Sequence, residues 1–197
     1  MDETLLIALL VIAALAVGAW LLMRQRQSKH LRSQFGPEYE RELEEKGSHR
    51  KAEAELAARE KRVSKLDIRP LEPAARDGFK LRWTEVQARF VDDPPGAVTE
   101  ADNLLGGVMS TRGYPVSDFE QRAGDISVHH PEVVKHYRAG HDITVRHERG
   151  EANTEELRQA MIHYRELFVE LVDDDGGKRS ADAGGMDNAT AERRVKS

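Results

Sequence analysis

The sequence predicts an all-α protein with an amino-terminal transmembrane helix, a charged helical stalk, a small antiparallel helical bundle and a disordered carboxy-terminal tail. An uncharged apolar run covers residues 5–23, and apolar residues recur at helical spacing between residues 73 and 172. No stretch alternates apolar and polar residues for long enough to predict a strand. Charged residues make up 33% of the chain and aromatic residues only 6%, which favours helices with narrow apolar stripes over a large interior.

The predicted transmembrane helix follows a short amino-terminal segment, residues 1–4, and runs from Leu5 to Met23 with the sequence LLIALLVIAALAVGAWLLM. At 1.5 Å per residue this run is about 28 Å long, close to the thickness of a hydrocarbon core. Trp20, near its end, suits the aromatic belt at a membrane interface. The run is therefore long enough to cross a bilayer.

A cleaved signal peptide is the main alternative, because Ala14-Leu15-Ala16 has the small-x-small form of a cleavage site. However, the residues before the apolar run are Asp2 and Glu3 rather than basic ones. The apolar run also continues past the candidate cleavage site to Met23. These features favour an anchor that stays in the protein.

Basic residues predict the orientation of this anchor. Four of them follow the span directly: Arg24, Arg26, Lys29 and Arg32. The positive-inside rule places such a flank in the cytoplasm, so we expect the amino terminus outside and the soluble body inside. The same cluster could lie on anionic lipid head groups. Ala14 and Gly18 form a small-xxx-small pair that could bring two anchors together as a homodimer, or could reflect composition alone.

Between the anchor and the bundle we expect a hinged, charged connection. Residues 24–36 form a basic juxtamembrane segment that ends in a hinge at Phe35-Gly36-Pro37, since glycine and proline interrupt helices. Residues 37–72 are dense in Glu, Lys, Arg and Ala and predict a helical stalk with a proline-rich linker. Its apolar positions follow a sevenfold spacing only in part, so a solvated stalk and a coiled-coil dimer both stay open: Leu43, Leu56, Val63 and Leu66.

Residues 73–172 predict four or five amphipathic helices. The first has an aromatic face, and the last repeats apolar residues at spacings of four and three: Phe79, Trp83, Val86 and Phe90, then Leu157, Met161, Tyr164, Phe168 and Leu171. Asp93 and Asn153 are expected to cap helices, and Ser117 with Glu120 has the form of a capping box. The remaining residues, 173–197, have too little apolar content to fold.

No motif predicts catalysis, a cofactor or a metal, and the chain contains no cysteine. Six histidines fall in the second half of the bundle, but no two of them have the His-x3-His spacing that places two imidazoles on one helix face: His129, His130, His136, His141, His147 and His163. The closely mixed charges, with a net charge of −5, argue against a nucleic-acid partner. Tyr114, between Gly113 and Pro115, could contribute to a groove for a protein partner.

Several short segments resemble a family of uncharacterised bacterial single-pass membrane proteins with an amino-terminal anchor: FGPEYER, RFVDDP, RGYP, DFEQRA and HPEVVKHYR. The resemblance covers the chain from the anchor to about Val172 and implies a bacterial inner or plasma membrane. It brings no known activity with it.

The function that these features favour is that of a non-enzymatic membrane-tethered adaptor or scaffold, which presents a helical bundle to a cytoplasmic protein partner. Two alternatives stay open at this point. A small-ligand-binding module or enzyme would need a cavity with convergent polar groups inside the bundle. A homo-oligomeric structural protein would be joined through the stalk.

Overall fold

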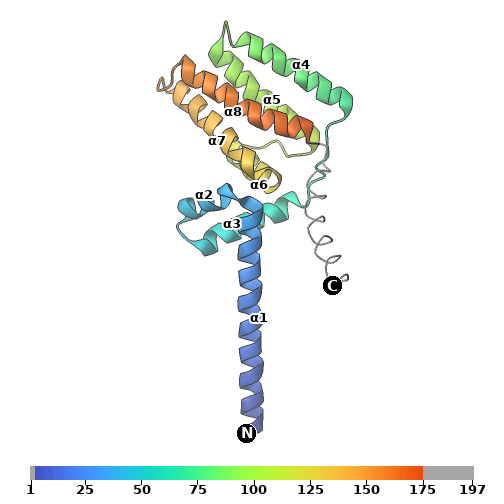
Figure 1. Cartoon of the computed structure of the whole chain (residues 1–197), viewed down its shortest axis with the longest axis vertical. Coiled ribbons are helices and arrows are strands. Elements are labelled where there is room, and N and C mark those ends of the chain that lie inside the picture. The colour runs from blue at the N-terminus through green and yellow to red at the C-terminus, as the bar shows by residue number, and fades with distance from the viewer. Residues whose placement is uncertain (1–2, 175–197) are drawn as a thin grey trace, which may run out of the picture.

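The computed structural model describes residues 3–174, with side chains described from Leu10 onward, and contains eight α-helices and no strand in that part of the chain. The prediction of an all-α fold is confirmed. The helices are α1 (Glu3–Phe35), α2 (Pro37–Lys46), α3 (His49–Val63), α4 (Pro73–Arg89), α5 (Pro94–Arg112), α6 (Phe119–His129), α7 (Pro131–Glu148) and α8 (Thr154–Asp173). Helix α1 projects away from the rest of the molecule as a single rod (Figure 1).

Among the helices whose residues are described, none is both long enough and apolar enough to cross a membrane. The predicted span Leu5–Met23 lies within α1, and its side chains at 5–9 fall outside the described ones. The predicted tail at 175–197 also lies outside the described residues.

Helices α4 to α8 form the bundle that the sequence predicts between residues 73 and 172. Helix α8 packs against α7 on one side and α5 on the other, and α4 covers α5 (Figure 1). The apolar repeat of α8 is buried throughout, and Trp83 of α4 stacks on Phe168 with ring centroids 4.6 Å apart. Phe79 and Phe90 of the predicted aromatic face are partly buried against the same core.

The predicted helix caps are present with one exception. Asp93 accepts from the amide of Gly96, and Asn153 and Glu156 form the full capping box of α8. Helix α6 is capped by Asp118 rather than by the predicted Ser117: the Asp118 carboxylate accepts from the Gln121 amide at 2.9 Å. The sequence alone does not distinguish Ser117 from Asp118, because both carry a side chain that can cap a helix.

The bundle is not antiparallel throughout, which corrects the prediction. Helices α5 and α8 end at the same end of the bundle, where buried Arg112 donates to the Leu171 carbonyl at 2.6 Å and to the Asp174 carboxylate at 2.7 Å. The pair is parallel because α6 and α7 return the chain to the far end before α8 begins. Arg112 also supplies a cation to carbonyls at the end of α8, where positive charge is favourable.

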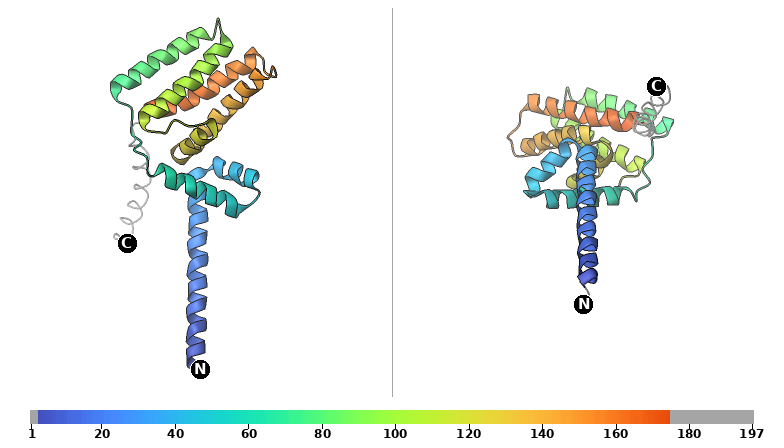
Figure 2. Two further views of the ribbon diagram at one scale, coloured as in Figure 1. Left: turned by 180° about the vertical axis from the view of Figure 1, so that it is seen from behind. Right: turned by 60° about the horizontal axis from the view of Figure 1, so that its bottom comes forward.

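Residues 37–72 do not form the predicted stalk. They fold into a hairpin of α2 and α3, which lies between α1 and the bundle (Figure 2). Leu56 and Val63 are buried, and Leu43 and Leu66 are partly buried, in a second apolar cluster with Leu31, Phe35, Tyr39 and Val128. The residues considered for a coiled-coil seam are therefore already buried within the chain. They are not available to join two copies of the protein through residues 37–72.

The predicted hinge is a fixed corner. The helix does break where expected, at Gly36, which has a φ of 45° that favours glycine. However, Phe35 and Tyr39 on either side are both 0% exposed. Gln34 also donates to the Val128 carbonyl of α6 at 2.7 Å. Burial on both sides of the break holds α1 in place against the body.

Two helical glycines provide a test of the bundle packing. At Gly140 of α7 an added Cβ would lie 2.7 Å from the Tyr164 ring of α8, whereas at Gly78 of α4 it would meet nothing within 4 Å. Gly140→Ala is expected to destabilise the protein by about 1–3 kcal/mol through overpacking. Gly78→Ala is expected to stabilise it by about 0.5–1 kcal/mol, because alanine favours the helix. Chemical denaturation of both variants measures the difference, and equal effects would contradict the close approach of α7 and α8.

Candidate functional site

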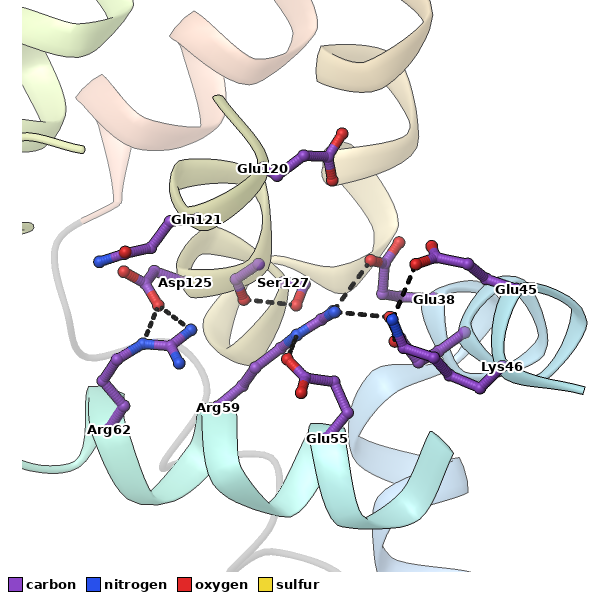
Figure 3. A network of polar contacts seen from close by, with 12 residues as sticks. Glu38, Glu45, Lys46, Glu55, Arg59, Arg62, Glu120, Gln121, Asp125 and Ser127 are labelled. Carbon is purple, nitrogen blue, oxygen red and sulfur yellow. Dashed lines mark hydrogen bonds and ion pairs between the residues drawn. The ribbon is translucent and has the colours of Figure 1, made fainter. Parts of the chain in front are cut away.

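The most unusual feature of the described structure is a buried network of charged side chains where the hairpin meets the bundle (Figure 3). Its centre is Arg59, which lies on the inward face of α3 between buried Leu56 and Val63. Helical spacing places these three residues on one face, so α3 cannot bury its apolar side chains without burying the guanidinium as well. An arginine in this position requires carboxylate partners.

Arg59 contacts three carboxylates. Its Nη1 lies 3.3 Å from Glu38 Oε1, its Nη2 lies 2.5 Å from Glu42 Oε2, and its Nε lies 3.2 Å from Glu55 Oε1. The side chains of Glu38 and Glu42 are 2% and 0% exposed, so these two pairs are shielded from solvent. Figure 3 shows the guanidinium pointing from α3 toward α2. The pairs therefore fix the face that each hairpin helix presents to the other.

Glu38 also connects the hairpin to the bundle. Its Oε1 accepts from Arg138 of α7 at 3.0 Å, a contact between residues 100 positions apart, and from Arg41 of α2 at 3.0 Å. The other terminal nitrogen of Arg138 donates to Glu120 of α6 at 2.7 Å. A single carboxylate thus pairs with arginines of α2, α3 and α7.

A second ion pair, in which only the carboxylate is buried, joins α3 to α6. Arg62 donates to Asp125 Oδ1 through Nε at 2.9 Å, with Nη2 2.7 Å from the same oxygen, and the Asp125 side chain is 1% exposed. Gly124, the neighbour of Asp125, leaves room for the long arginine of α3, since an added Cβ would lie 3.3 Å from Arg59 Nε. The two arginines of α3 hold α6 and α2 through separate carboxylates.

An open polar cleft of about 610 Å³ lies beside this network. Its arginine and lysine side chains each already have a carboxylate partner, including Lys46, which lies 2.8 Å from Glu45. The lining residues are Arg41, Glu45, Lys46, Glu55, Arg59, Arg62, Asp118, Glu120 and Gln121. These charged groups therefore neutralise one another across α2, α3 and α6.

The residues predicted to flank the membrane lie on α1. Trp20 is 57% exposed, and the Arg24 guanidinium lies 5.6 Å from the centre of its ring. Arg26 and Lys29 are exposed on the same helix. Arg32 lies over the Tyr39 ring at 5.0 Å and 3.6 Å from Glu40, so it belongs to the junction with the hairpin.

Tyr114 does not lie on a partner surface. Its side chain belongs to the main apolar core, and the residue is only 3% exposed. The chain leaves α5 through Gly113, whose φ of 102° turns Tyr114 back toward the helix end. The position between glycine and proline suggests a residue of a partner groove, but the structure places the Tyr114 ring in the core.

The predicted histidines are dispersed over several contacts. His136 of α7 and His163 of α8 face each other with their Nδ1 atoms 3.1 Å apart. Burial lowers the pKa of His163, and the neighbouring His136 lowers it further, so His163 favours the neutral state. His141 stacks on Phe119, and burial lowers its pKa. Among the described residues, no group of three or more His, Cys, Asp or Glu side chains could hold a metal ion.

The network could not be predicted from the sequence. Two of its local pairs, Glu38 with Arg41 and Glu55 with Arg59, have the spacings of three and four that are typical of contacts on a helix surface. The burial of Glu38 depends on Arg59 and Arg138, which are 21 and 100 residues away. No local spacing marks such partners. A weak signal was Asp125, a lone acid in the otherwise uncharged run from Ala123 to Val128.

Comparison with known proteins gives no relative: no family model matches, and no curated protein or solved structure is significantly similar to the chain. The resemblance to uncharacterised bacterial membrane proteins stays a prediction.

Replacing Arg59 tests the network. Arg59→Met is expected to destabilise the protein by about 3–5 kcal/mol, because it leaves the carboxylates of Glu38 and Glu42 buried without their central cation. Arg158→Met is the matched control, since Arg158 pairs with Glu155 on the exposed surface and should cost no more than about 1 kcal/mol. Chemical denaturation of each variant measures the change in its free energy of unfolding.

Adding Glu42→Gln to Arg59→Met is expected to recover part of the loss, because it removes one of the charges left without a partner. Arg59→Met behaving like Arg158→Met would show that the network does not hold the hairpin.

Proposed function

We propose that the protein is a single-pass membrane scaffold that holds its helical bundle at a fixed distance and orientation from the bilayer, for recognition by a cytoplasmic protein partner. The observation that carries the proposal is the buried network of Arg59, Glu38 and Arg138. It joins the hairpin beside α1 to the bundle through buried side-chain contacts. A flexible tether would need no such contacts.

The membrane anchor is supported by the sequence and by the surface of α1. From Leu10 to Met23 its large apolar side chains are 53–71% exposed, and they form a continuous apolar surface on a helix that projects from the body. An exposed apolar surface of this extent is typical of a contact with a membrane or with another protein. The uncharged run from Leu5 to Met23, followed by four basic residues, favours a bilayer with the body on the cytoplasmic side. A bacterial inner or plasma membrane is the setting we propose.

The scaffold role is favoured over the alternatives by how the charged groups are used. A small-ligand module or enzyme would need polar groups that converge on a cavity, whereas the cations of the polar cleft are paired with carboxylates of the chain. A homodimer through Ala14 and Gly18 of α1 is compatible with the proposal. An added Cβ at Gly18 meets nothing within 4 Å, so that surface is open.

The absence of cysteine makes the topology simple to test. A single cysteine at Gln87, an exposed position of α4, is expected to react with a membrane-impermeant maleimide only after the cytoplasmic membrane is permeabilised. A single cysteine at Asp2 should react without permeabilisation. Reversed labelling would overturn the orientation, and release of the protein from membranes by alkaline carbonate would overturn the anchor.

Capture of the intact protein from membranes tests the scaffold role. We expect a protein partner in stoichiometric amount with the wild type and a reduced amount with the double variant Arg59→Met/Arg138→Met, in which the bundle is no longer fixed to the hairpin. The exposed variant Arg158→Met should recover as much partner as the wild type does. Capture of the chain alone from wild-type membranes would contradict a scaffold for a stable partner.

A further inference from the structure

Helix α3 has two faces with different surroundings. Its inward face carries Ala52, Leu56, Arg59 and Val63, all buried against the rest of the body. The opposite face, at helical spacing from Arg50 and Lys51 through Ala54 and Ala58 to Lys61, is exposed, and so is Lys65 in the turn that follows the helix. Because α3 lies under the bundle on the side from which α1 projects, this exposed face turns toward the amino-terminal end of α1 (Figures 1 and 2).

The exposed face is basic, and its cations have no acidic partner among residues 3–174. The acidic residues of α3 are used elsewhere: Glu53 accepts from the Tyr39 hydroxyl, Glu55 pairs with Arg59, and Glu60 contacts His30. By contrast, no ion pair is formed within the described chain by Arg50, Lys51 or Lys61 of α3, by Lys65 in the turn after it, or by Arg24, Arg26 or Lys29 of α1. Seven cations thus gather around the base of the projecting helix.

A groove separates α3 from α1 at this level. It has a volume of about 420 Å³ and is lined by Trp20, Arg24, Gln27, Arg50, Glu53 and Ala54. Arg24 and Arg50 approach it from different helices. At 1.5 Å per residue, Gln27 lies about 10 Å along α1 from Trp20, the residue that suits the membrane interface. The groove is therefore at the height of lipid head groups if α1 enters the bilayer.

We propose that α3 lies on the membrane surface as a second membrane contact, and that its basic face and the α1–α3 groove bind the phosphates of anionic phospholipids. This inference rests on the proposed anchor, and charge complementarity selects the occupant. Arginine and lysine attract the phosphates of an anionic membrane surface. The fixed corner at Gly36 holds α3 beside α1 at the height of these phosphates. The lipid contact adds a second restraint on the orientation of the bundle.

Quenching of tryptophan fluorescence by brominated lipids tests this in the full-length protein. The protein is reconstituted into phosphatidylcholine vesicles that contain a minor fraction of phosphatidylglycerol. In matched preparations either the phosphatidylglycerol or an equal fraction of the phosphatidylcholine is brominated. Trp20 reports the lipids beside the groove, and the Trp20→Phe variant measures the contribution of Trp83, which is buried in the bundle core.

Brominated phosphatidylglycerol is expected to quench Trp20 more strongly than brominated phosphatidylcholine, and added salt should reduce the difference by screening. The triple variant Arg50→Gln/Lys51→Gln/Lys61→Gln should lose the preference, since each basic residue near such a surface contributes about fivefold to affinity. The matched control Arg82→Gln/Arg149→Gln/Arg165→Gln removes the same charge from exposed positions of the bundle and should keep the preference.

The outcomes separate this inference from the proposed anchor. Equal quenching of the wild type by the two lipids, or an unchanged preference in the α3 variant, overturns the lipid contact while leaving α1 in the membrane. Absence of quenching by either lipid overturns the anchor, and the lipid contact with it.

Discussion

The structure depends on one buried cation. Arg59 lies among Glu38, Glu42 and Glu55 beneath the bundle, and its removal from water costs several kcal/mol before any pairing is counted. Such a pair is weak evidence for stability, since apolar residues of similar size could pack as well. It does restrict which helices can be neighbours, because any arrangement that separates α3 from α2 leaves charges buried without partners.

The same constraint extends outward from the hairpin to the parts on either side of it. Toward the bundle, Arg138 of α7 shares Glu38, and Arg62 reaches Asp125 of α6. Toward α1, Leu31 and Phe35 enter the apolar cluster that Leu56 and Val63 of α3 help to form. Helix α1, which the sequence predicts to be a separate anchor, is therefore packed against the body at its carboxy-terminal end. This packing fixes the direction in which its exposed part projects.

Parallel packing of α5 and α8 has a related origin. Their shared end is closed by Arg112, which is 2% exposed and is held by the Leu171 carbonyl and the Asp174 carboxylate. The Arg112 carbonyl in turn accepts from the Arg69 amide at 2.9 Å, so the linker into α4 is fixed at the same point. In both places an arginine donates hydrogen bonds to acceptors from segments distant in sequence. These bonds hold the helices that carry them together.

The sequence by itself determined the features that depend on nearest neighbours along the chain. Apolar periodicity predicted the buried stripe of α8, and capping residues predicted the starts of α5 and α8, because helix formation and capping act over three or four residues. The apolar run of α1 and its basic flank are likewise local. Only the tertiary structure decided that the charged segment is a packed hairpin, that Tyr114 is buried and that α5 runs parallel to α8. Each of these features rests on contacts between residues tens of positions apart. Without their distant partners, the Glu and Arg residues of the hairpin would be equally compatible with a solvated helix.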